Sequence, residues 1–126
     1  MPRVSANKAI KIQDAIDLKA ATTLPATYGD WISAELDVDG IAKLKLLLVV
    51  SGSYDGTSIQ LKGQVVEGVN YDEYQTDGTL DEQTLIVTAD GNYSLEYQAP
   101  SFDRVRFLAK RTGGSQGNLQ LSVLGG

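Results

Sequence analysis

Residues 41–67, IAKLKLLLVVSGSYDGTSIQLKGQVVE, are the stretch that decides the fold of this chain. Strict alternation in the first part predicts a strand with one apolar face, made of Ala42, Leu44, Leu46, Leu48 and Val50. A second strand follows, in which Ile59, Leu61, Gly63 and Val65 oppose Ser58, Gln60, Lys62 and Gln64. The small residues and the Asp-Gly pair of 51–56 predict a chain reversal. We therefore expect these two strands to form an antiparallel hairpin.

Short alternating segments continue through the rest of the chain, separated by Asp-Gly, Pro or Gly-rich turns. They predict further strands at residues 31–37, 84–89, 93–97, 102–112 and 119–123. Seven or eight short strands without alternating helices are typical of an all-β antiparallel sandwich of jelly-roll or Greek-key type. Its expected core is Leu44, Leu46, Leu48, Ile59, Leu61, Val105, Phe107, Leu119 and Leu121.

The first residues are less decisive. Residues 1–8 show no apolar period and are expected to form an N-terminal arm, which leaves 9–126 as a single β-sandwich domain. Residues 9–21 fit both a helical stripe and strand alternation. We expect an extended segment with a break near residues 13–14, because everything downstream is β.

Composition excludes several classes of function. The 126 residues carry a net charge of −5, which argues against a nucleic-acid partner. Cysteine and histidine are absent, so that disulfides, thiolate metal sites and the commonest general base are missing, and no cofactor or metal is expected. No apolar run approaches the roughly 20 residues of a membrane helix. The first residues lack the apolar stretch of a secretory signal, so we expect no membrane association and synthesis in the cytoplasm.

Four Asp-Gly pairs (Asp39-Gly40, Asp55-Gly56, Asp77-Gly78, Asp90-Gly91) offer oxygen ligands for calcium. They stand where strands must reverse, however, and none lies in a D-x-[DN]-x-[DN]-G loop, so we interpret them as turns. The acidic pairs Asp72-Glu73 and Asp81-Glu82 are neighbours in sequence and point to opposite sides of a strand. Serine nucleophiles lack a histidine to activate them. An enzyme is the least favoured class.

Exposed aromatic residues suggest a carbohydrate-binding module as one alternative. Trp31, Tyr54, Tyr71 and Tyr74 lie in or near predicted loops, where aromatic rings can stack on sugar faces. The competing interpretation is that these rings cover the edge of the core while their polar atoms reach water.

Two further surfaces are candidates for an interface. Leu47 and Val49 point away from the predicted core, beside Lys43 and Lys45. Apolar residues at such positions need a cover, which is either residues 9–24 or a neighbouring subunit.

The second surface is a basic ridge of Arg104, Arg106 and Lys110. An acidic partner surface is one explanation for it. The other is a structural cross-strand pair between Arg104 and Glu96.

Residues 58–78, SIQLKGQVVEGVNYDEYQTDG, form a strand that leads into a polar loop. Residues 91–125, GNYSLEYQAPSFDRVRFLAKRTGGSQGNLQLSVLG, contain an aromatic-x-Arg-Val-Arg core, a Thr-Gly-Gly loop and a final L-x-L-x-V strand. Together these stretches, a little under half of the chain, resemble small β-sandwich virion proteins of tailed bacteriophages, of the head-decoration or cement type. In that family the first stretch leads into a G-S-x-D-G-x-x-W loop. Here residues 68–72 depart from the pattern, and Tyr74 stands near the expected tryptophan.

The resemblance implies a non-enzymatic structural subunit of the virion, first of all a capsid decoration or stabilising protein. Its implied partners are copies of itself, as a trimer before a dimer, and a major capsid or other virion protein. Arg104 and Arg106 match the family pattern, although no contact role is transferred to them. A tail or baseplate protein and a carbohydrate-binding module remain alternatives, with a small hydrolase as a distant third class.

Overall fold

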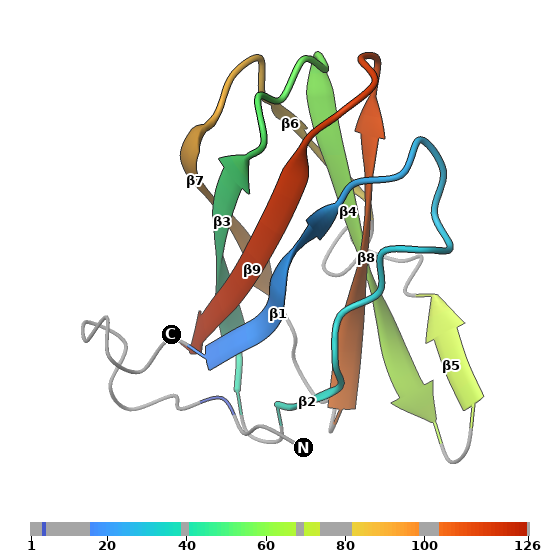
Figure 1. The fold of residues 1–126 in the computed structure, drawn as a ribbon. Helices are drawn as coiled ribbons and strands as arrows, with labels where there is room; N and C mark the ends of the chain where they lie inside the picture. Colours follow the sequence, from blue (N-terminus) through green and yellow to red (C-terminus); the bar gives the residue numbers. More distant parts are fainter. Residues whose placement is uncertain are drawn as a thin grey trace.

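The structure is a computed structural model that describes residues 4, 16–38, 41–67, 70–73, 82–98 and 104–125, with the backbone alone at 65–67, 70–73 and 98. The described residues form nine strands and no helix, arranged as two facing sheets (Figure 1). The strands are β1 (Ile16–Thr23), β2 (Leu36–Asp37), β3 (Lys43–Ser51), β4 (Ser58–Glu67), β5 (Asn70–Glu73), β6 (Gln83–Ile86), β7 (Gly91–Gln98), β8 (Arg104–Thr112) and β9 (Asn118–Gly125).

The order of the strands is that of a jelly roll, as expected. Sheet B has the order β1-β9-β3-β7, and sheet A has the order β2-β8-β4-β5, with β6 also paired to β4. Both β5 and β6 pair along the edge of β4 that β8 leaves open, so the nine strands fill eight positions. Every pair is antiparallel, and the chain wraps around one core shared by two layers.

The expected hairpin at residues 41–67 is wrong. β3 pairs with β7 and β9, whereas β4 pairs with β5, β6 and β8, so the two strands lie in opposite sheets. Residues 52–57 therefore arch from one layer to the other. Alternation assigned the inward faces correctly, because both point into the same core. It carries no information about which strand lies alongside.

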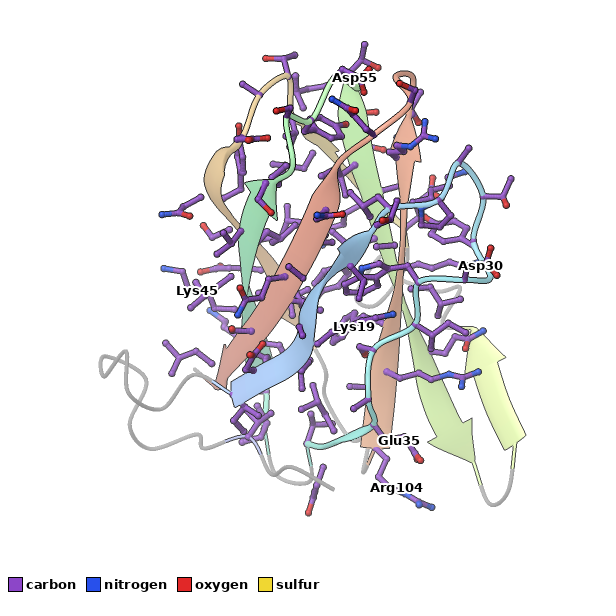
Figure 2. All side chains as sticks on the ribbon, viewed as in Figure 1. Lys19, Asp30, Glu35, Lys45, Asp55 and Arg104 are labelled. Carbon is purple, nitrogen blue, oxygen red and sulfur yellow. The ribbon has the colours of Figure 1, made fainter. Side chains whose placement is uncertain are left out.

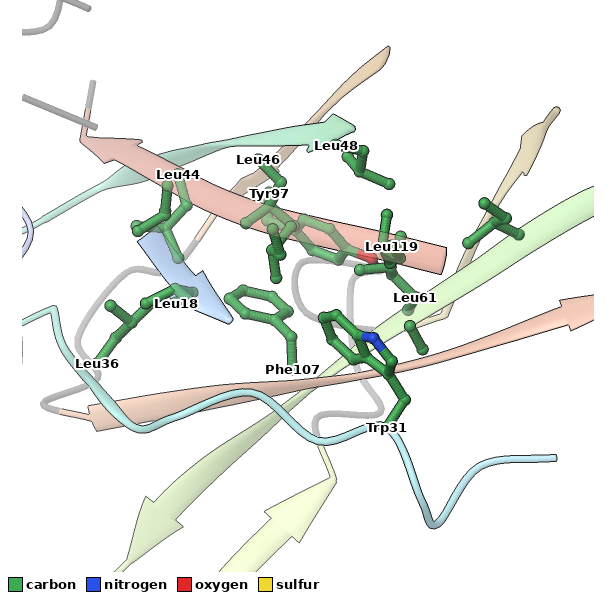
Figure 3. Packing of buried hydrophobic residues seen from close by; sticks show 14 of the residues in the cluster. Leu18, Trp31, Leu36, Leu44, Leu46, Leu48, Leu61, Tyr97, Phe107 and Leu119 are labelled. Carbon is green, nitrogen blue, oxygen red and sulfur yellow. The ribbon is translucent and has the colours of Figure 1, made fainter. Parts of the chain in front are cut away.

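The core between the sheets contains all nine residues that the sequence places there, each at most 1% exposed (Figure 3). Ala42 is the exception to the alternation, since it is exposed just before β3 begins. The two sheets also meet directly at the centre. The rings of Tyr97 on β7 and Phe107 on β8 have centroids 5.4 Å apart, and the Tyr97 hydroxyl donates to the Leu61 carbonyl oxygen at 2.8 Å.

The segment at 31–37 follows the edge of β8, but less regularly than the expected strand. Only Leu36–Asp37 is a strand, and Ile32 forms an isolated bridge with Leu108. Between them the Ser33 hydroxyl accepts a hydrogen bond from the Phe107 N–H at 2.8 Å. Leu108 alternates with Arg106 and Lys110 on the outer face of β8 and is nevertheless buried, with Ile32 directly opposite.

Two parts of the N-terminal segment are described, Val4 and β1, and both contact the rest of the domain. Val4, in the segment expected to be an arm, is buried, and its N–H donates to the Asp37 carbonyl oxygen at 3.0 Å. β1 confirms an extended chain for the second part of residues 9–21; residues 9–15 lie outside the described ranges. No helix in the described part of the chain is long and apolar enough to span a membrane.

Candidate functional site

Leu47 and Val49 lie in the middle of the outer face of sheet B. Both are on β3, which runs between β7 and β9, and Val49 is 41% exposed while Leu47 is half-buried. Lys43 and Lys45 are exposed on the same face, and Lys45 projects away from the sandwich (Figure 2). Because β1 pairs with β9, residues 16–23 extend the edge of this sheet and do not lie over β3.

Uncharged polar residues surround this apolar pair. Directly opposite Leu47 and Val49 in the two neighbouring strands are Asn92 and Ser94 on β7 and Gln120 and Ser122 on β9. The nearest opposite charges face each other at the next position, where Lys45 lies across from Glu96. The positions directly beside Leu47 and Val49 on β7 and β9 are therefore uncharged, and the nearest charges are Lys45 on β3 and Asp17 on β1, whose carboxylate accepts from Gln120 Nε2 at 3.2 Å.

The predicted basic ridge lies on the other sheet, on the outer face of β8. Arg104 Nη1 lies 3.9 Å from Glu35 Oε1, with both side chains about 40% exposed, at 40% and 42%. Arg106 Nε donates to Gln64 Oε1 at 2.9 Å. Sheet A and sheet B face opposite ways, so the two halves of the predicted interface are not brought together. They form two separate surfaces.

Tyr28 connects two strands of sheet A, β4 and β8, with Glu82, the residue before β6. Its ring centroid lies 4.5 Å from Lys62 Nζ on β4 and 4.8 Å from Lys110 Nζ on β8, and its hydroxyl donates to Glu82 Oε2 at 2.6 Å. Cation–π contacts of this kind contribute about 0.5–1 kcal/mol each at exposed sites. The loop at residues 24–30 is thereby held over the sheet (Figure 1). Sequence reasoning missed Tyr28, since nothing local links a loop tyrosine to lysines on two distant strands.

The expected pair between Glu96 and Arg104 is wrong. Glu96 is on β7 in sheet B and Arg104 is on β8 in sheet A, so they are not cross-strand neighbours. Across the strands Glu96 lies opposite Lys45 and Arg104 lies opposite Asp37, while the Arg104 guanidinium pairs with Glu35. The error follows from treating strands that are consecutive in sequence as neighbours in a sheet.

Two of the Asp-Gly aspartates join loops at one end of the sandwich. Asp55 accepts hydrogen bonds from the N–H groups of Ser115 and Gln116 at 2.8 and 3.0 Å, and these bonds hold its pKa below the usual range. Asp90 accepts from the N–H groups of Ser53 and Tyr54 at 3.1 and 2.8 Å. Asp55 therefore ties the β3–β4 arch to the β8–β9 loop. Asp39-Gly40 and Asp77-Gly78 lie outside the described residues.

The room for these contacts depends on glycine. Gly114 has φ +73°, and an added Cβ would lie 2.6 Å from the Asp55 carbonyl carbon and from the Gly56 nitrogen. This conformation and this close approach both favour glycine.

Two of the predicted sugar-stacking residues are excluded by burial. Trp31 is 0% exposed, and Tyr54 is 5% exposed with its hydroxyl donating to the Ser58 carbonyl oxygen at 2.8 Å. A ring enclosed by protein cannot stack on a sugar, so both rings belong to the core. Burial raises the pKa of Tyr54. The side chain of Tyr71, on β5, and the whole of Tyr74 lie outside the described part.

Lys19 and Trp31 close the edge of the sandwich where β1 faces residues 31–37. Lys19 Nζ lies 4.5 Å from the Trp31 ring centroid and donates to the Ile32 carbonyl oxygen at 3.0 Å. Burial lowers the pKa of this lysine. The indole Nε1 of Trp31 is buried without a hydrogen-bond partner among the described residues.

Of the four side chains in the predicted acidic pairs, the structure describes only that of Glu82. Asp81 lies outside the described residues, Glu82 holds Tyr28, and for Asp72-Glu73 only the backbone of β5 is described. Within the described ranges no group of three or more His, Cys, Asp or Glu side chains is placed to hold a metal ion.

No protein-family model and no curated protein matches this chain. Among solved structures it is similar to the SPBc2 prophage-derived protein YomS, at 15% identity and a TM-score of 0.45, over 86% of this chain and 90% of that one. It is also similar to part of an arabinose-bound GH51 α-L-arabinofuranosidase, at 11% identity and a TM-score of 0.37. That match covers 97% of this chain and 25% of the enzyme chain. Similarities at this level assign no function.

Proposed function

We propose that this chain is a structural subunit of a tailed-phage virion, a capsid decoration or stabilising protein that assembles through the outer face of sheet B. The observation that supports it is the pair of Leu47 and Val49 on the central strand, partly exposed and bordered by uncharged polar residues. The pair and the uncharged residues beside it can be buried against protein without leaving an unpaired charge in the interface. The phage assignment itself comes from the sequence resemblance of residues 58–78 and 91–125.

Several polar and aromatic side chains of the described residues hold the fold together. Asp55 and Asp90 accept backbone hydrogen bonds between loops, Tyr54 and Trp31 are buried, and Tyr28 links a loop to sheet A. This use of polar and aromatic side chains supports a role in assembly. Each contact between subunits adds little by itself, since fully burying one Val or Leu side chain contributes roughly 1.5–3 kcal/mol. A repeated lattice multiplies that contribution.

Self-association tests the surface. We expect the purified protein to form a homo-oligomer, a trimer before a dimer, at micromolar concentration, and the Leu47→Asp/Val49→Asp double variant to dissociate it into a smaller folded species in size-exclusion chromatography with light scattering. The matched control is Thr84→Asp/Ile86→Asp. Ile86 is more exposed than Val49, at 72%, but lies on β6 of sheet A. A wild-type monomer, together with an equally soluble Leu47/Val49 variant, contradicts the proposal.

Particle composition tests the virion assignment. The protein should co-sediment with intact phage particles from a lysate of the strain that carries the gene, and it should remain with them through a density gradient. Presence only in the soluble fraction, with particles complete in its absence, contradicts a virion role and leaves the self-association result standing.

A further inference from the structure

The edges of the two sheets differ in how well they are protected. Within the described residues, β2 has two residues, and β5 and β6 have four each. β1 is longer, but its register with β9 shifts twice, between Asp17 and Lys19 and between Lys19 and Thr22. Short and irregular edge strands are a common means by which proteins avoid pairing with other chains.

β7, at the opposite edge of sheet B from β1, has neither form of protection. It spans eight residues, Gly91–Gln98, and pairs with β3 at eight consecutive positions without a shift. Its sequence GNYSLEYQ contains no proline and no lysine, and Asn92, Ser94 and Glu96 are exposed. β7 is therefore the long, regular edge of the described structure.

The direction of its backbone groups follows from one side-chain contact. Gln83 Nε2, on β6 of the other sheet, donates to the Glu96 carbonyl oxygen at 3.0 Å, so this carbonyl points away from β3. In an antiparallel strand every second residue directs its N–H and C=O to the same side. The backbone groups of Asn92 and Ser94 therefore point outward too, and no described residue outside the sheet bonds to them.

We propose that β7 pairs antiparallel with β7 of a second copy, centred on Ser94, and so joins two copies of sheet B into one continuous sheet. In this register Asn92 faces Glu96 of the second copy, which pairs an amide donor with a carboxylate, and the Asn92 N–H replaces Gln83 Nε2 as the donor to the Glu96 carbonyl oxygen. Tyr93 faces Leu95 of the second copy on the inner side. A register centred on Glu96 would instead oppose two carboxylates, which is unfavourable. The strand is therefore complementary to itself about a two-fold axis.

This contact is distinct from the apolar face of the proposed function. Substitutions of two serines distinguish the two contacts. Ser94 on β7 and Ser122 on β9 both lie directly opposite Leu47, one on each side. If the copies associate through the face, Ser94→Lys and Ser122→Lys should weaken association equally. A contact through the β7 edge places two lysines against each other in Ser94→Lys alone. By sedimentation velocity we expect Ser94→Lys to weaken association at least roughly threefold more than Ser122→Lys. Equal effects overturn edge pairing.

A proline tests the backbone bonds themselves. Ser94→Pro removes an N–H that points outward, so the fold should survive and association should weaken roughly tenfold or more. Leu95→Pro, whose N–H points to β3, should instead unfold the domain. In the associated wild type the amide protons of Asn92 and Ser94 should exchange more slowly than in dilute protein. Unchanged association of a folded Ser94→Pro, or unprotected amides, overturns the edge contact. Dissociation by the Leu47/Val49 variant would still support the face.

Discussion

Ser58 and Gln60 on β4 are polar outward residues that are buried, whereas Leu47 and Val49 on β3 are apolar outward residues that are partly exposed. Ser58 and Gln60 are 6% and 8% exposed on the outer face of sheet A, while Val49 reaches 41% on the outer face of sheet B. Strand polarity alone predicts the reverse. On sheet A residues 24–30 bring Tyr28 against Lys62 and Lys110, and Lys110 lies directly opposite Gln60.

The covered face also satisfies its own polar groups. Gln60 Nε2 donates to Ser58 Oγ and Gln60 Oε1 accepts from Thr112 Oγ1, both at 2.8 Å, so these side chains remain hydrogen-bonded when water is excluded. The surface around Gln60 on sheet A is thus covered by its own chain, although Ile86 on β6 is 72% exposed. Sheet B leaves apolar surface at its centre and a regular strand at its edge, which is why both proposals concern sheet B.

The largest expected effect compares adjacent residues of β3. Leu46 is 0% exposed and Leu47 is half-buried on the opposite face. Leu46→Ala should lower the free energy of unfolding by about 2–5 kcal/mol, because it removes core contacts and leaves a cavity. Leu47→Ala should cost at most about 1 kcal/mol in the monomer. Urea unfolding at a concentration where the protein is monomeric measures both. Equal losses would show that Leu47 is in a second core.

A smaller loss is expected when the cover of sheet A is removed. Tyr28→Ala deletes the ring that contacts Lys62 and Lys110 and the hydroxyl bonded to Glu82, and should cost about 1–3 kcal/mol in urea unfolding. Tyr28→Phe keeps the ring and should lose only the hydroxyl bond, about 1 kcal/mol. A Tyr28→Ala variant as stable as wild type would mean that the loop does not cover this face.

The end where both sheets are joined should respond to acid. The pKa of Asp55 is lowered from 3.8 by the N–H groups of Ser115 and Gln116, so the folded state holds its proton less tightly than the unfolded state. The stabilisation is therefore complete above about pH 4 and is lost as the pH falls through the folded pKa. Melting temperatures measured from pH 7 downward should fall less steeply in acid for Asp55→Asn than for wild type. Asp30→Asn, on the exposed loop, controls for the change of charge. Parallel curves for all three proteins would show that Asp55 does not contribute to the loss of stability in acid.

Sequence reasoning reached the inward faces of β3, β4, β8 and β9 because alternation reports directly which residues share a side. It did not reach the pairing of strands, so residues 41–67 were assigned to one hairpin and Glu96 was placed beside Arg104. Nor could the sequence predict which residues of the outer faces are buried. Whether Val49 or Gln60 is covered depends on where residues 24–30 cross the sheet, and that is set by contacts between residues far apart in sequence.

The smallest expected effect is at Arg104, which belongs to the covered sheet and to the predicted basic ridge. Its guanidinium lies 3.9 Å from Glu35 with both side chains well exposed to solvent, and exposed ion pairs of this kind contribute about 0–1 kcal/mol. Arg104→Ala should therefore change the urea midpoint very little, and Glu35→Gln should change it by a similar amount.

Because Arg104 is on sheet A, Arg104→Ala should also leave self-association unchanged in light scattering, at low salt as well as at high salt. Comparison with Leu47→Asp/Val49→Asp shows which of the two faces carries the contact. If removing Arg104 dissociates the oligomer while the double aspartate variant remains assembled, the two faces have exchanged roles and the partner binds the basic ridge. If Arg104→Ala leaves the oligomer unchanged and the double variant dissociates it, the charge on β8 is structural and the open face of β3 carries a contact between copies.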